Sequence, residues 1–444
     1  MGWMSVFGAS AASAVGLHLT LFSLYAVICF QLLRRLETPI WVMQIAGGFL
    51  LAITFHDRPD TLAQVLGLGA VYAWLRGWEA ITGGPNSGTA SWWSWLATGL
   101  AVLSLCASLQ IGAMYIFFLS FGTVVARFHC RMKLPLLPLV AMPVLSALLA
   151  LIAKFGFPNW WAGLMENFGD NPSVQGWHWP DVGSILKLGR TLPGLGLVVL
   201  LVALGMRSRG AFKTRDSKTW VVLLTTIAAA LGVVAVSLCY LTPNYLLFAA
   251  YLQPLAVGAF LGWWGSLNLG VPQVRVLMGL FVLAIAVCAV RAVGMTTWGV
   301  LCASDVSYAK ATALVDAELN GLGAGVPKVA VVSSAFLYSA GRHRDVRLIH
   351  SDYVIRPRPG LVDGDLTGLL TQKPSRLILT QFDYYRRYQP TLALLKSQPE
   401  VASLNITNMA KVRPPDASAS LQKFVQHVSW APVIVGLEWK APKQ

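Results

Sequence analysis

The sequence predicts a polytopic α-helical membrane protein with about ten transmembrane helices, followed by a C-terminal α/β domain outside the cytoplasm. Hydrophobic residues make up 56% of the 444 residues and charged residues only 12%, with a mean hydropathy of +0.61. Long apolar runs recur through the first two thirds of the chain, as in membrane-spanning proteins. From about Ser304 the apolar runs shorten and charge rises, so we expect a helical domain over 1–296 and a second domain over 297–444.

The apolar runs are long enough, or nearly so, to cross the hydrocarbon core of a bilayer. The predicted spans are Val6–Leu33, Pro39–Phe55, Thr61–Leu75, Trp92–Ser108, Ile111–Ala126, Leu134–Ala153, Thr191–Met206, Trp220–Tyr240, Tyr245–Trp264 and Val274–Val293. The fourth and fifth are nearly continuous, with only Gln110, Ile111 and Gly112 to form a turn between them.

Lysine and arginine gather in every second loop, which orients the chain by the positive-inside rule. The predicted cytoplasmic loops lie at Arg34–Arg35, Arg76, Arg127–Lys133, Arg207–Lys218 and Arg275. The opposite side receives His56–Asp60, Gln110, Lys154–Gly189, Thr242–Asn244 and everything after Met295. This predicts a multi-pass protein with its C-terminal domain outside the cytoplasm.

Charge and cysteine usage exclude two classes of function. The net charge is +15, but the positive residues lie mostly in short loops and one C-terminal region, without a basic stripe carrying interleaved aromatics. We therefore expect no nucleic-acid partner. The six cysteines are scattered and none forms a C-x-x-C pair, so neither a disulfide framework nor a zinc site is indicated.

The stretch His56–Asp60 holds four ionisable side chains between two apolar runs. Charge so close to hydrocarbon is costly. One interpretation is a polar turn, in which Arg58 reaches lipid headgroups and Pro59 and Asp60 start the next helix. The other is a site at the membrane surface, where His56, Asp57, Arg58 and Asp60 bring an anionic headgroup together with a metal ion or an acceptor. The sequence leaves both interpretations open.

The long loop Lys154–Gly189 lies on the same predicted side. Its tryptophans, Trp160, Trp161, Trp177 and Trp179, are typical of a segment at the headgroup level. The loop also carries Glu166, Asp170, His178 and Asp181. Two polar loops on one face of the membrane predict a single site formed from both.

The C-terminal region alternates strands and helices, which favours a small α/β domain with a mainly parallel sheet. The predicted strands are Lys328–Ser333, Val346–His350, Arg376–Thr380, Val401–Asn405 and Val433–Leu437, and the predicted helices are Ser304–Leu319, Ser334–His343 and Phe382–Lys396. No G-x-G-x-x-G or P-loop pattern occurs, so no nucleotide is implied. The clusters Arg342–Arg344 and Tyr384–Tyr388 form either a solvated basic face, the commoner case, or a contact with anionic headgroups.

Several short motifs in this organisation are similar to those of one superfamily. They are the Arg34-Arg35 turn, the start Arg58-Pro59-Asp60-Thr-Leu-Ala of the next span, the tightly joined pair Trp92–Ala126, and Thr242-Pro243-Asn244-Tyr245 ahead of Leu252-Gln253-Pro254-Leu255. The chain resembles the GT-C integral membrane glycosyltransferases, in particular the family 39-like members that include protein O-mannosyltransferases and the aminoarabinose transferase of lipid A.

The resemblance implies a cell-envelope enzyme that transfers a sugar from a polyprenyl-phosphate donor to an acceptor on the extracytoplasmic (periplasmic) side, with inversion at the anomeric carbon. Such chemistry needs a carboxylate to accept the proton of the acceptor, a cation at the leaving phosphate and an apolar groove for the lipid. We expect Asp57 or Asp60 to be this catalytic carboxylate, with Glu166 or Asp170 as its partner.

Substrate-binding residues are expected around these acids. Arg58, Arg190 or Arg291 would neutralise the phosphate, and the remaining substrate-binding candidates are His56, His178, Asp181, Asn244 and Tyr245. His56, Asp57, Asp60 and His178 also offer ligands of the kind divalent metals take, which leaves a metal cofactor open without an assigned ligand set.

Two departures from the family pattern qualify the resemblance. Asn244 stands where the family usually has arginine before the tyrosine. The chain also begins at what would be the second span of the family, so we expect its first span, first outer loop and usual catalytic acid to be missing.

The alternative to an enzyme is a non-catalytic polyprenyl-lipid-binding protein or a transporter with the same fold. Transporters tend to show inverted repeats and charged spans at the midplane. This chain shows no convincing internal repeat and almost no midplane charge, and the predicted outer α/β domain suits an enzyme better.

Overall fold

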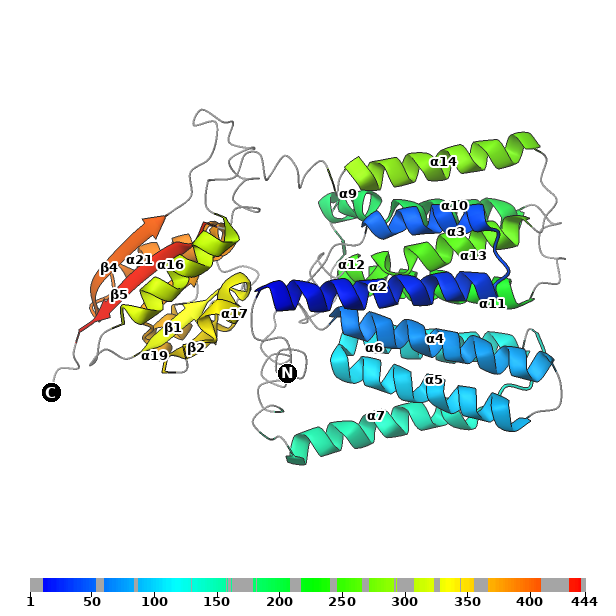
Figure 1. Cartoon of the computed structure of the whole chain (residues 1–444), viewed down its shortest axis with the longest axis horizontal. Helices are drawn as coiled ribbons and strands as arrows, with labels where there is room; N and C mark the ends of the chain where they lie inside the picture. The colour runs from blue at the N-terminus through cyan, green and yellow to red at the C-terminus, as the bar shows by residue number, and fades with distance from the viewer. Residues whose placement is uncertain are drawn as a thin grey trace. The chain divides into compact units, whose positions relative to one another are not determined.

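A computed structural model gives the arrangement of most of the chain (Figure 1). It describes residues 11–52, 60–83, 87–128, 130–156, 158, 161, 179–180, 182–207, 217–239, 246–265, 271–290, 293, 307–322, 328–343, 345–354, 366–408 and 431–440. The chain divides into two compact units, His18–Ala292 and Val293–Gln444 together with Met1–Leu17. The domain boundary expected between residues 296 and 297 stays a prediction.

The first unit is a bundle of apolar helices that lie side by side in Figure 1. Its longer helices are α2 (Ala11–Arg35), α4 (Asp60–Thr82), α5 (Ser87–Ala107), α6 (Leu109–Phe128), α7 (Leu137–Gly156), α10 (Pro193–Arg207), α11 (Ser217–Cys239) and α14 (Val271–Ala289). The shorter ones are α3 (Ile40–Gly48), the 3₁₀ turn η1 (Phe49–Ala52), α9 (Val182–Thr191), α12 (Leu246–Ala250) and α13 (Gln253–Gly265). Leucine and valine side chains such as Val27, Val140 and Leu283 are exposed on the bundle surface, as expected of a surface that faces lipid.

The lengths and compositions of these helices identify a membrane protein. Within the described residues, five helices are long and apolar enough to cross a bilayer: Gly16–Arg35, Gly88–Ala107, Leu109–Phe128, Lys218–Cys239 and Pro272–Ala289. Shorter apolar helices cover Val140–Gly156 and Pro193–Gly205. A mainly helical membrane protein with a small sheet in its C-terminal region is thus confirmed, whereas the total of about ten spans stays a prediction.

The predicted turn between the fourth and fifth spans lies elsewhere. Helix α5 ends at Ala107 and α6 begins at Leu109, so Gln110 and Gly112 are helical. A Cβ added to Gly112 would lie 2.1 Å from the Cα of Leu105. Glycine at this position therefore allows the two helices to meet closely right after the turn.

Two predicted spans are interrupted rather than continuous. The segment predicted as Tyr245–Trp264 breaks between α12 and α13, around Tyr251 and Leu252. Pro254 lacks the N–H that a continuous helix needs and its ring crowds the preceding turn, which accounts for the break. The segment predicted as Pro39–Phe55 is helical from Ile40 to Gly48 and then tightens into η1.

The C-terminal unit contains a five-stranded sheet in the order β2-β1-β3-β5-β4. Its strands are β1 (Val329–Val332), β2 (Arg347–His350), β3 (Arg376–Leu379), β4 (Val401–Asn408) and β5 (Val433–Trp439). Its helices are α16 (Tyr308–Asn320), η6 (Ser334–Phe336), α17 (Leu337–Ala340), α18 (Ser351–Val354), α19 (Thr367–Gln372), α20 (Gln381–Asp383), the π-helical turn η7 (Tyr384–Tyr388) and α21 (Gln389–Leu395). Apolar clusters pack on both faces of the sheet.

The expected mainly parallel sheet is only half parallel. Strand β1 pairs in parallel with β2 and β3, but β5 pairs antiparallel with both β3 and β4. Antiparallel neighbours need no crossover helix, and β4, an edge strand with mostly exposed side chains, lacks the continuous apolar run of a buried parallel strand.

The two clusters considered for headgroup contact are partly used within the domain. Tyr384 and Tyr388 are buried in the core, and the Tyr388 hydroxyl donates to the Ser351 carbonyl at 2.8 Å. His343 lies 2.9 Å from an Asp316 carboxylate oxygen. The two tyrosines therefore stabilise the sheet and are not free to contact lipid.

Candidate functional site

Helix α4 carries polar side chains into the bundle from its first turn. It begins at Asp60, where a carboxylate is favoured by the partial positive charge of the helix N-terminus. Asp60 is only 7% exposed, and Thr61 and Gln64 are more deeply buried. Asp60 and Gln64 are four residues apart, so they share one face of the helix. This face brings a carboxylate and an amide into a mainly apolar bundle.

Tyr115 of α6 lies across this face of α4. A Cβ added to Gly67 would lie 1.9 Å from the Tyr115 ring, so the ring occupies space that only glycine leaves free. The Tyr115 hydroxyl donates a 2.7 Å hydrogen bond to Gln64 Oε1. Gln64 is fully buried, and its Nε2 has no hydrogen-bond partner among the described residues. An unused buried donor costs about 1–3 kcal/mol, so this amide calls for a partner that the described part of the protein does not supply.

Tyr251 completes the group from the break between α12 and α13. Its side chain lies near Asp60 and Thr61, but the buried Thr61 hydroxyl has no hydrogen-bond partner among the described residues. The backbone carbonyl of Tyr251 accepts a hydrogen bond from the Tyr25 hydroxyl of α2. The rings of Tyr25 and Tyr251 meet edge to face, with centroids 5.3 Å apart. We call Asp60, Thr61, Gln64, Tyr115 and Tyr251 the polar cluster.

Gln253 joins the same break to the start of α10. Its Nε2 donates to the Thr191 carbonyl at 3.2 Å, and its Oε1 accepts from the Gly194 N–H at 3.1 Å. A Cβ added to Gly194 would lie 2.4 Å from Phe49, so this junction is also closely packed. The contacts hold Thr191, the last residue of α9, and the start of α10 against the start of α13.

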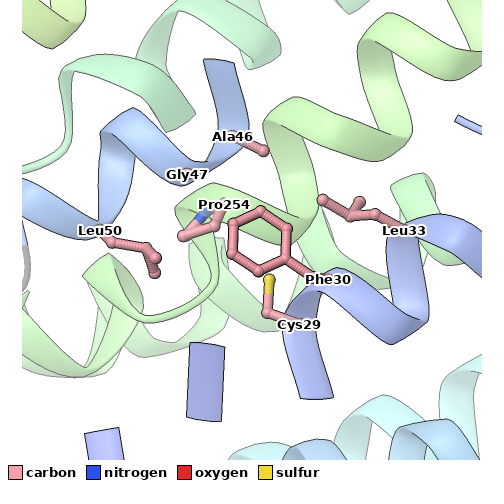
Figure 2. A pocket seen from close by; sticks show the side chains of 7 residues that line it. All are labelled: Cys29, Phe30, Leu33, Ala46, Gly47, Leu50 and Pro254. Carbon is pink, nitrogen blue, oxygen red and sulfur yellow. The ribbon is translucent and has the colours of Figure 1, made fainter. Parts of the chain in front are cut away.

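An apolar groove lies one helical turn from Tyr25 along α2. It is lined by Cys29, Phe30, Leu33, Ala46, Gly47, Leu50 and Pro254. Figure 2 shows the Phe30 ring in the middle of these side chains. The groove encloses no space large enough for a water molecule, so it is a shallow apolar surface and not a cavity that holds a ligand.

The structure places two of the predicted site residues. Asp60 lies in the polar cluster, and Arg190 lies in α9, although its side chain is not among those described. The other predicted residues fall outside the described part of the chain: His56, Asp57, Arg58, Glu166, Asp170, His178, Asp181, Asn244, Tyr245 and Arg291. Their proximity to one another stays a prediction. Among the described residues, no three His, Cys, Asp or Glu side chains gather as metal ligands would.

The sequence reasoning missed Gln64, Tyr115, Tyr251 and Gln253. A signal was present, because Gln64 and Gln253 are amides inside predicted spans, and polar residues at such positions mark functional sites. The tyrosines gave no comparable signal, since an aromatic ring in an apolar run more often belongs to the core.

Comparison with known proteins supports the fold alone. No protein-family model matches the chain, and no curated protein matches it either. Among solved structures, it is similar to the crystal structure of ArnT from Cupriavidus metallidurans bound to undecaprenyl phosphate, with a TM-score of 0.51 and 12% sequence identity. The match covers 97% of this chain and 85% of the ArnT chain. The chain therefore shares the overall fold of that ArnT structure.

Proposed function

We propose that this protein is a membrane glycosyltransferase that moves a sugar from a polyprenyl-phosphate-linked donor to an acceptor on the extracytoplasmic side of a bacterial inner membrane. The observation that carries the proposal is the polar cluster, where a carboxylate and an amide with an unused donor are buried in a GT-C-like bundle. The structural neighbour ArnT was crystallised with undecaprenyl phosphate, a lipid of the proposed class.

The proposed reaction breaks the bond between the anomeric carbon and the phosphate oxygen. A new bond forms between that carbon and an acceptor oxygen, while the acceptor proton passes to a carboxylate. Asp60 or Asp57 is the proposed base, with Glu166 or Asp170 as a second, partner carboxylate. Polyprenyl phosphate departs with the bonding electrons.

Charged residues would bind the phosphate of the donor, and apolar surface would bind its lipid chain. Arg58, Arg190 or Arg291 would neutralise the leaving phosphate. The Gln64 amide would donate to a phosphate or sugar oxygen, which would give its buried N–H a partner. The groove beside Phe30 would contact part of the isoprenoid chain. His56, His178, Asp181, Asn244 and Tyr245 are the further proposed contacts.

The proposal includes a topology of ten spans over 1–296, with the domain 297–444 outside the cytoplasm. Reporter fusions test it directly. A reporter joined after Lys218 should be active only in the cytoplasm, and one joined at Gln444 only outside it. The reverse result at either position would refute the orientation.

Binding of a polyprenyl-phosphate analogue tests the site. The full chain in detergent is titrated alongside Asp57→Asn, Arg58→Ala and Gln64→Leu, with affinities normalised to folded protein. We expect Arg58→Ala and Gln64→Leu to weaken binding about tenfold or more, because each removes a hydrogen-bond donor to a charged group. Wild-type affinity in all three variants would remove the polar cluster and the His56–Asp60 stretch from the site.

A non-catalytic polyprenyl-lipid-binding protein is the second candidate, favoured by one observation. The groove beside Phe30 is entirely apolar and needs no carboxylate to contact a lipid chain. Turnover separates the two candidates: the enzyme releases polyprenyl phosphate from a polyprenyl-phosphate sugar, whereas the binding protein retains the intact donor.

A further inference from the structure

Three basic side chains converge on one carboxylate at the end of the bundle away from the polar cluster. Glu79, near the end of α4, lies 3.1 Å from Arg35 of α2, 3.5 Å from Arg76 of α4 and 3.6 Å from Lys218 of α11. Arg35 ends α2 and Lys218 stands at the start of α11. The contacts therefore join three helices at one end. We call Arg35, Arg76, Lys218 and Glu79 the basic cluster.

The charges of the basic cluster do not balance. One carboxylate neutralises one of three cations, which leaves an excess of two positive charges among the residues of the cluster. The side chains of Arg35, Arg76 and Lys218 are 35%, 32% and 18% exposed. They are thus accessible to a ligand but partly removed from water, and this strengthens their attraction for an anion relative to fully solvated side chains.

Aromatic rings hold two of the guanidinium groups in place. The Arg35 guanidinium lies 5.9 Å from the centroid of the Tyr72 ring, and that of Arg76 lies 5.3 Å from the Trp93 ring. Trp93 lies near the start of α5, and tryptophan near the end of an apolar helix is typical of the headgroup level of a membrane. Arg35 lies at the end of α2 and Lys218 at the start of α11, and both helices are long and apolar enough to span a bilayer. A span that ends at Arg35 and a span that begins at Lys218 would each put that charge at the edge of the hydrocarbon core, next to the lipid headgroups.

We infer that the basic cluster binds the headgroup of an anionic membrane phospholipid, with its phosphodiester between Arg35, Arg76 and Lys218. The phosphate would supply the negative charge that Glu79 alone does not. The acyl chains would lie along the apolar helices that carry these cations. The site is independent of the proposed sugar transfer, because it lies at the opposite end of α4 from Asp60.

Native mass spectrometry of the full chain in mild detergent tests the site. Phosphatidylglycerol is titrated against phosphatidylcholine with the same acyl chains. Wild type should bind phosphatidylglycerol more tightly, and Arg35→Gln and Lys218→Gln should each weaken that binding about fivefold. Arg275→Gln is the matched control, because Arg275 is an exposed arginine of α14 outside the basic cluster. It should leave the affinity unchanged.

Glu79→Gln distinguishes a lipid site from an ion network that only stabilises the fold. Because Glu79 competes with the phosphate for the same cations, its removal should raise the affinity for phosphatidylglycerol. A structural network predicts a lower melting temperature for Glu79→Gln with no gain in lipid binding, and that result would overturn the inference. The inference would also be overturned if free glycerol phosphate bound as tightly as phosphatidylglycerol. The same holds if Arg275→Gln and Arg35→Gln lost equal affinity for phosphatidylglycerol. If Arg35→Gln does not fold, Glu79→Gln decides alone.

Discussion

The two ends of the helical bundle handle polar groups in opposite ways. In the basic cluster, full charges sit partly in solvent, three of them around Glu79. In the polar cluster, one carboxylate, hydroxyl groups and an amide are almost completely buried. The basic cluster has more charge, but water and headgroups can reach it, so its free-energy cost is small. The polar cluster has less charge but a higher cost per group, because the bundle excludes water.

The difference shows which end to associate with chemistry. A charge that solvent can reach costs little free energy and is no sign of catalysis, whereas a buried donor without a partner calls for an explanation. Gln64 Nε2 is such a donor, and it lies one turn from Asp60. Counting charged residues along the chain would have pointed to the basic cluster instead.

The same chemical change at both ends should have opposite effects. We expect Asp60→Asn to lower turnover about 10²- to 10⁴-fold, as removal of a general base does, while it changes the free energy of unfolding by no more than about 1 kcal/mol. Glu79→Gln should leave turnover unchanged. Release of polyprenyl phosphate from a polyprenyl-phosphate sugar measures both. Full activity in Asp60→Asn would reduce Asp60 to a helix-starting residue.

Close packing at the polar cluster is tested by a pair of glycines. Gly67→Ala should lower the free energy of unfolding by about 1–3 kcal/mol, because its Cβ meets the Tyr115 ring. Gly99→Ala, where no atom lies within 4 Å of the added Cβ, should be neutral or raise it by up to about 1 kcal/mol. Thermal unfolding in detergent compares them. Equal stabilities would mean that Tyr115 does not lie across α4 in this way.

Substitution of both partners of the Tyr115–Gln64 hydrogen bond distinguishes a role in folding stability from a role in lipid binding. The double variant Gln64→Leu with Tyr115→Phe leaves no unpaired partner, so the free energy of unfolding should stay within about 1 kcal/mol of wild type. Affinity for a polyprenyl-phosphate analogue should nevertheless fall about tenfold. Tyr115→Phe alone is the control and should retain most of the affinity. A large loss of stability with unchanged affinity would assign the pair to the core.

The smallest effect is expected for the ion pair between Lys328 and Asp345 in the C-terminal unit, whose side chains are 32% and 62% exposed. This pair gives a reference for both clusters. The hydrogen bond from Lys328 lowers the pKa of the Asp345 carboxyl in the folded protein. The contribution of the pair is therefore present above the unfolded pKa of about 4 and is lost as pH falls through the lower folded value. Asp345→Asn should remove this acid dependence and barely change the melting temperature at neutral pH. Melting curves between about pH 2 and pH 7 would show it.

The sequence predicted regular elements well where one periodicity dominated. The strands at Val329–Val332, Arg347–His350 and Arg376–Leu379 lie within a residue of their predicted bounds, because short β-branched and leucine-rich runs between polar turns allow little else. Antiparallel pairing of β5 was not predictable, since no local pattern states which neighbour a strand will join. The break at Tyr251 was foreseeable from Pro254 but was hidden by the apolar run around it.

Of the candidate site, the sequence supplied Asp60 and little else that the structure describes. Asp60 was identifiable because it adjoins other ionisable residues at the start of an apolar run. Gln64, Tyr115 and Tyr251 come together only through helix packing, with Gly67 opening the space for the Tyr115 ring. Such a contact depends on the relative rotation of two helices, which the pattern of either helix alone does not determine.

The fully paired amide of Gln253 has a consequence for biogenesis. Helix α13, with 13 residues, is about 20 Å long, too short to cross a hydrocarbon core of about 30 Å alone. The partners of its amide, Thr191 and Gly194, lie earlier in the chain, so they have left the ribosome before Gln253 is synthesised. We expect α13 to enter the bilayer late, and only by packing against the junction of α9 and α10. Nascent chains truncated between α10 and α13 should therefore insert normally. Insertion of α13 itself should depend on the helices that are already in the bilayer.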